Sequence, residues 1–141
     1  MAVTHTVTFE AAVSSSEDGG FDGVTPPPGR TIAEMLAATV ERSGVKITKP
    51  ISQFEAYGWS FTAQEEDTEI ECMLQRSDEW LLLFISRTPL LRRLFRRATQ
   101  TSVGPIAKAI DTFLHQHPQV RNVRWYTGDE FETKRPGHAH P

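Results

Sequence analysis

The sequence has very little cysteine, no long apolar stretch and almost no excess charge. Cys72 is the single cysteine in 141 residues, which rules out an internal disulfide and favours a reducing, cytoplasmic compartment. The longest apolar run, Trp80 to Ile85, is much shorter than the roughly 20 residues of a membrane-spanning helix. The formal net charge is −3, so the chain as a whole is not expected to attract nucleic acid.

Signatures of catalysis and of membrane targeting are also absent from the sequence. It contains no glycine-rich phosphate loop, no Gly-x-Ser-x-Gly motif and no Ser/His/Asp order typical of a hydrolase. The first 13 residues lack the basic start and the apolar stretch of a signal peptide, and no lipidation motif is present. We therefore expect a non-enzymatic protein without a cofactor, a membrane anchor or a specific nucleic-acid partner.

Alternation of apolar and polar residues predicts five β-strands. They cover residues 3–9, 57–64, 69–75, 80–85 and 120–126. The threonine-rich first strand is expected at an edge of the sheet. The strand at 80–85 is apolar on both faces, which is typical of a strand in the middle of a sheet.

Two main helices are predicted between these strands. Thr31 is expected to cap the first helix, with Glu34 completing a capping box, and Gly44 to end it in a left-handed conformation. Pro50 is expected in the connection that follows. The second helix is expected to end just before Pro118, and its apolar stripe consists of Ile106, Ile110, Phe113 and Leu114.

Together these elements predict an α+β fold. Its sheet is mainly antiparallel and consists of the N-terminal strand, a three-strand meander and the C-terminal strand, with both main helices packed on one face. Residues 1–127 are expected to form a single domain in which 14–29 is a mobile loop. Residues 128–141 are polar and are expected to form a flexible tail that frays.

An arginine-rich amphipathic segment at 87–97 is the strongest candidate for a binding surface. It holds five of the eleven arginines of the chain, namely Arg87, Arg92, Arg93, Arg96 and Arg97. Guanidinium groups pair well with carboxylates. The favoured hypothesis is an acidic protein partner bound by Arg92, Arg93, Arg96 and Arg97, with Tyr57 and Tyr126 as exposed contacts. A solvated helix face that pairs with the acidic residues of 65–71 is the plain alternative.

Two further functions stay open from the sequence. One is a small-molecule or anion-binding domain, with or without enzyme activity, whose pocket lies between sheet and helices. In that pocket Arg87 or Arg124 would bind a carboxylate or phosphate. The other is self-association as a homodimer across the first strand, if that strand leaves an unpaired edge.

For the histidines, the cysteine and the tryptophans, the sequence indicates structural roles. His115 and His117 are two positions apart on a helix and point to different sides, while His138 and His140 lie in the polar tail, so no metal site is expected. Cys72 falls on the inward face of its strand and is expected to be an unreactive core residue. The core is also expected to contain most of the three tryptophans, Trp59, Trp80 and Trp125.

Overall fold

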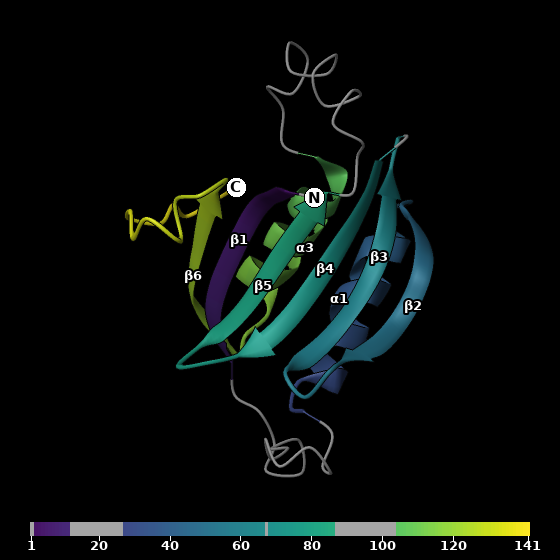
Figure 1. The fold of residues 1–141 in the computed structure, drawn as a ribbon, viewed down its shortest axis with the longest axis horizontal. Coiled ribbons are helices and arrows are strands. Elements are labelled where there is room, and N and C mark those ends of the chain that lie inside the picture. Colours follow the sequence, from purple (N-terminus) through teal and green to yellow (C-terminus); the bar gives the residue numbers. More distant parts are fainter. Residues whose placement is uncertain (1, 12–26, 67, 87–103) are drawn as a thin grey trace.

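The computed structural model describes residues 2–11, 27–66, 68–86 and 104–141. The described strands form one sheet in the order β2-β3-β4-β5-β1-β6, and every neighbouring pair is antiparallel (Figure 1). The protein therefore has an α+β fold. The elements in chain order are β1 (Ala2–Ala11), α1 (Arg30–Arg42), β2 (Lys46–Phe54), β3 (Gly58–Glu65), β4 (Thr68–Arg76), β5 (Trp80–Ser86), α3 (Pro105–Gln116) and β6 (Val120–Thr127).

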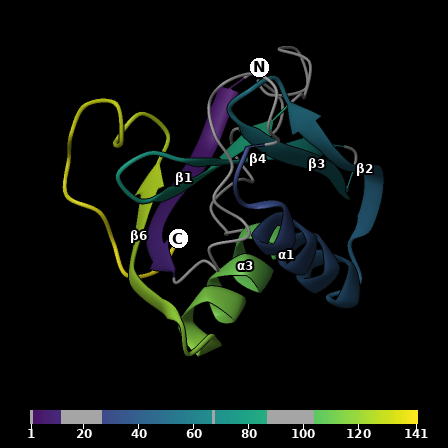
Figure 2. The ribbon, with the colours of Figure 1, turned by 90° about the horizontal axis from the view of Figure 1, so that it is seen from below.

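Both helices cover the same face of the sheet, as Figure 2 shows. Alternate residues of the strands point toward the helices and are buried, which the strand patterns predict. Trp59, Cys72, Trp80 and Trp125 all lie in this core, as expected. The helices contribute Ala33, Leu36, Val40, Ile106, Ala107, Ile110 and Leu114. Among the described residues, no helix is both long and apolar enough to cross a membrane.

Strand β2 is the element that the sequence did not predict. It extends the predicted meander of β3, β4 and β5 to four strands and forms one edge of the sheet. Its pairing with β3 shifts register between Ile47 and Lys49 and again between Lys49 and Ser52. Pro50 lies within the strand, which an edge position allows because one side of such a strand needs no ladder hydrogen bonds.

Strand β1 lies inside the sheet, and its prediction as an edge strand is wrong. It pairs with β5 on one side and with β6 on the other. Thr6 and Thr8 are buried, each with 1% of its surface exposed, although their threonine-rich pattern is typical of a half-exposed strand. Both backbone ladders of β1 are therefore used within the chain, and a homodimer cannot form across it. The prediction that β5 is a central strand is confirmed.

The N-cap of helix α1 lies two residues before the predicted one, and the helix has no capping box. Gly29 precedes its first residue in the left-handed conformation, with φ 103°, and no side chain caps the helix. Thr31 lies inside the helix, so it cannot cap it. Gly44 does end the helix region with φ 97°, as predicted. Pro27, at the end of the expected loop, is buried, and its carbonyl oxygen accepts a 2.9 Å hydrogen bond from the Trp59 indole.

The C-terminal tail contacts β6 in the structure, while its expected flexibility stays a prediction. His138 pairs with Trp125 through two backbone hydrogen bonds of 2.7 and 2.8 Å, so the tail adds a short bridge to the outer edge of β6. Glu130 accepts hydrogen bonds from the Thr127 backbone at 2.7 Å and from the His138 ring at 3.1 Å. The tail therefore has both backbone and side-chain contacts with residues of and beside β6.

Candidate functional site

A cavity of about 210 Å³ lies where the start of α1, the end of α3, the end of β1 and the start of β6 meet. We call it the α1/α3 cavity. Most of its wall is apolar, and three polar residues, Thr31, His117 and Gln119, also line it. The principal apolar side chains are those of Phe9, Ile32, Met35, Phe113, Leu114 and Val120.

The cavity uses apolar residues that the sequence pattern places in the core. The stripe of α1 includes Ile32 and Met35, but both stay half-buried, while Leu36 and Val40 pack fully against the sheet. Phe113 of α3 is likewise half-buried. The two apolar stripes are therefore wider than the part that packs against the sheet. Their remaining, half-buried side chains line the cavity.

The polar part of the wall is centred on His117. Its Nδ1 accepts a 3.2 Å hydrogen bond from the backbone N–H of Gln119, so in the neutral ring Nε2 carries the proton and can donate. Its ring lies 5.4 Å from that of Phe113, centroid to centroid. The described lining residues include no carboxylate, cysteine or serine.

The residues predicted to bind a partner are not brought together by the described structure. Arg87, Arg92, Arg93, Arg96 and Arg97 lie outside the described residues, so their role stays a prediction.

The predicted residues that the structure does describe lie far apart on the sheet. Tyr57 is exposed in the turn between β2 and β3, whereas Tyr126 is on β6 at the opposite side of the sheet and packs edge-on to Phe131 at 5.2 Å. Arg124 is exposed on β6 and is not among the residues of the cavity wall, so the described cavity contains no arginine to read an anion.

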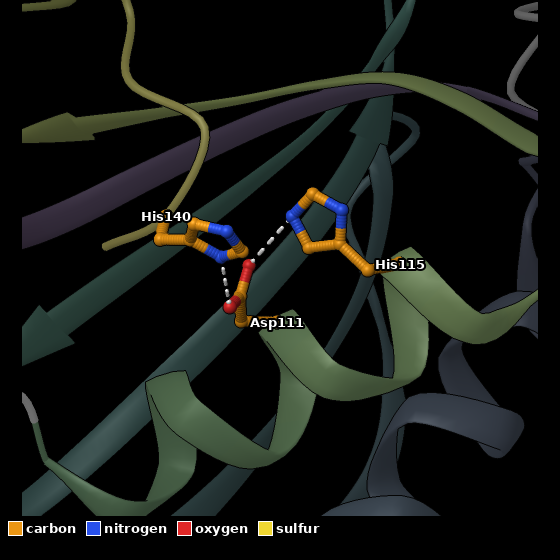
Figure 3. A group of neighbouring side chains, drawn as sticks. All are labelled: Asp111, His115 and His140. Carbon is orange, nitrogen blue, oxygen red and sulfur yellow. Dashed lines mark hydrogen bonds and ion pairs between the residues drawn. The ribbon is translucent and has the colours of Figure 1, made fainter.

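A second group of functional side chains was not predicted as a site. Asp111, His115 and His140, which we call the Asp–His cluster, meet between α3 and the tail (Figure 3). The Asp111 Oδ1 atom is 3.0 Å from His115 Nε2, and its Oδ2 atom is 2.8 Å from His140 Nδ1. The indole N–H of Trp125 also donates to Asp111 Oδ1 at 2.8 Å. The signal present in the sequence is the Asp-x-x-x-His spacing, which places two side chains one helical turn apart on one face.

Burial sets the ionisation of two groups beside the core. It raises the pKa of the Glu65 carboxyl, and a hydrogen bond from the Ile106 backbone partly opposes this effect. Burial also raises the pKa of the Cys72 thiol, and the nearby Glu65 and Glu71 add to the effect. A thiol held in its protonated form is a poor nucleophile, which supports a structural role for Cys72.

No protein-family model matches the chain, and no curated protein or solved structure is significantly similar to it. The functional argument therefore rests on the cavity and the side-chain geometry.

Proposed function

We propose that this protein binds a small molecule and that the α1/α3 cavity is the binding site. The observation that carries this proposal is the cavity volume of about 210 Å³. Protein interiors are packed about as tightly as organic crystals and contain few voids larger than a water molecule. An apolar cavity of about 150 Å³ in a protein interior is large enough to bind benzene. The α1/α3 cavity therefore has room for a ring-sized molecule.

The wall of the cavity defines the chemical class of the ligand. Its apolar surface favours an aromatic or aliphatic ring, because burial of apolar surface is the main source of affinity in such sites. His117 supplies a hydrogen-bond donor through Nε2, which suits a ligand with one oxygen acceptor. The described wall contains no arginine or lysine to neutralise a strongly charged anion. We therefore propose a neutral ring compound that carries a hydroxyl or carbonyl group.

Binding can be tested by NMR on the uniformly ¹⁵N-labelled full chain, titrated with indole, phenol and benzene. Phenol carries both the ring and the oxygen, so we expect it to shift the amide signals of Phe113 and His117 at the lowest concentration. Ala11 lines the cavity, and Ala11→Leu adds three carbon atoms to the wall, so this variant should bind at least about tenfold more weakly. Ala109→Leu is the matched control, because Ala109 is half-buried on α3 but is not in the cavity wall. Equal binding by wild type and Ala11→Leu, or no shift with any of the three probes, would contradict the proposal.

A protein-binding role for the arginine-rich segment is a second candidate. It is supported by the concentration of five arginines within residues 87–97. Reversal of charge at Arg92, Arg93, Arg96 and Arg97 should remove acidic partners from a pull-down. An unchanged partner set would place any interaction surface elsewhere.

The cytoplasmic location and the homodimer also remain proposals. The location is supported by the single, buried and unpaired Cys72, because proteins of oxidising compartments more often use disulfides. If the chain self-associates by edge-to-edge strand pairing, the contact involves an outer strand, since β1 is paired on both sides.

A further inference from the structure

The Asp–His cluster has the donor set of a transition-metal site, and it is separate from the α1/α3 cavity. We propose that Asp111, His115 and His140 bind a divalent ion of the zinc type. Two imidazole nitrogens and one carboxylate oxygen are ligands that Zn²⁺ accepts readily, and its later first-row neighbours accept them as well. Three protein ligands leave a fourth tetrahedral position for water or a backbone oxygen.

The three side chains already converge to the spacing that such an ion requires. Zinc bonds of about 2.0–2.1 Å in a tetrahedron place neighbouring ligand atoms about 3.3 Å apart. In the structure the two histidine nitrogens lie 3.0 and 2.8 Å from the Asp111 oxygens, and one ligand atom from each residue lies within 4.8 Å of the others. Small rotations of the side chains would therefore admit the ion without movement of the backbone.

The buried core holds the carboxylate of this site in place. The Trp125 side chain is fully buried, and its indole N–H donates to Asp111 Oδ1 at 2.8 Å. An outer hydrogen bond of this kind fixes the orientation of a metal ligand and is a regular part of metal sites. Asp111 itself is largely shielded, with 15% of its side chain exposed, which limits competition from water.

The tail supplies the third ligand and a backbone oxygen. His138 pairs with Trp125 through its backbone, so His140 is brought over α3 by the same bridge that fixes the tail to β6. The Ala139 carbonyl oxygen lies 2.8 Å from His115 Nε2, which puts a possible fourth ligand beside the site.

A hydrogen-bonded latch without metal is the alternative explanation of the cluster. The two imidazole rings are 4.6 Å apart, centroid to centroid, and both face one carboxylate. Two neutral rings can each donate a hydrogen bond to the carboxylate, or can each give a ring lone pair to one shared ion. The two explanations differ in whether the cluster takes up Zn²⁺, which a titration decides.

The test uses the purified full chain after treatment with a chelator, titrated with Zn²⁺ by calorimetry and with Co²⁺ by visible absorption. We expect one ion per chain. His140→Ala removes a direct ligand, and Asp111→Asn replaces a charged carboxylate with a neutral amide, so each should weaken binding by at least about 100-fold. Trp125→Phe removes the outer hydrogen bond and also reduces the volume of a fully buried side chain, so it should weaken binding about 10- to 100-fold together with some loss of stability.

His138→Ala is the matched control. His138 lies in the same tail as His140, but its ring contacts Glu130 and its backbone pairing with Trp125 does not need the side chain. Zn²⁺ affinity of this variant should equal that of the wild type. His140 is 68% exposed, so its replacement leaves the core intact, and circular dichroism of each variant checks that it is folded. The proposal is overturned if the wild type binds no more Zn²⁺ than the Asp111→Asn/His140→Ala double variant, or if His138→Ala loses as much affinity as His140→Ala.

Discussion

The carboxylate of Glu65, at the end of β3, accepts a 2.9 Å hydrogen bond from the backbone N–H of Ile106, in the first turn of α3. Glu65 thereby does for α3 what an N-cap side chain does in most helices, since Gly104 at the cap position has no side chain to offer. The contact joins two elements that are 41 residues apart in the sequence. It also places a negative charge at the positive end of the helix dipole.

Glu65→Ala should lower the free energy of unfolding by about 1 kcal/mol, because it leaves the Ile106 N–H without its acceptor. Glu65→Gln should cost less, since its amide oxygen still accepts and burial of the charge is relieved. Gly104→Ala would place a methyl group against the Glu65 carboxylate and push it out of contact. The Glu65→Ala/Gly104→Ala double variant should then lose at most a few tenths of a kcal/mol of stability beyond the loss of Glu65→Ala alone. Urea unfolding measures all four variants, and full additivity of the two single losses would show that the contact contributes nothing.

Gly29→Ala should destabilise the protein by about 2–5 kcal/mol. Its φ of 103° costs an L-residue about 1–2 kcal/mol, and the added Cβ would lie 2.6 Å from Cζ3 of the buried Trp80 ring, which adds an overpacking cost of about 1–3 kcal/mol. Gly44→Ala is the control, because it has a similar φ of 97° but nothing within 4 Å of the new methyl group. It should lose only the strain of about 1–2 kcal/mol. Equal losses in thermal unfolding would show that contact with Trp80 is not the cause.

His5 should make the protein less stable in mild acid. Burial lowers the pKa of its ring in the folded protein, where it packs edge-on to Phe84 and Trp125. Below the usual histidine pKa of about 6.5 the unfolded chain therefore takes up a proton that the folded chain resists, so stability falls as pH decreases through this range. The slope must stay below about 1.4 kcal/mol per pH unit, the limit for one proton.

The His5 effect is measured by comparing wild type with His5→Asn in denaturant unfolding between pH 8.5 and 5. The difference in stability between the two proteins should be constant above pH 7.5 and should shift in favour of the variant as the pH falls toward 5. A constant difference across the whole range would contradict the expectation.

The sequence predicted the centre of the fold better than its edges. In β4 and β5 the side chains at every second position are buried and most of them are apolar, as the sequence patterns predict. In β3 the apolar residues Trp59, Phe61 and Ala63 are likewise buried. Strand β2 lacks such an apolar pattern, because most of its side chains are exposed and Pro50 lies within the strand. Strand β1 gave the opposite error, because its threonines are typical of a half-exposed strand, yet Thr6 and Thr8 are buried and the strand pairs with both β5 and β6. Such pairing depends on distant parts of the chain.

The Asp–His cluster shows the same limit for a site. The spacing of Asp111 and His115 could be read from the sequence, because a helix brings these positions together wherever it lies. The arrival of His140 could not be read in this way. It depends on the backbone bridge between His138 and Trp125, and nothing in the residues of the tail specifies that partner. The α1/α3 cavity is a similar case, since the apolar stripes predicted helices but not the space left between them.

The bridge between the tail and β6 also affects how this sheet can meet other chains. On one side the outermost strand is covered in part by the tail of the same molecule, and on the other side Pro50 and two register shifts disturb the backbone of β2. A long and regular free edge is what a growing fibril needs as a template. Both margins of the described sheet are therefore interrupted, which makes them poorer templates for such pairing than a regular edge would be. Removal of the tail would uncover the regular part of β6 and weaken that protection.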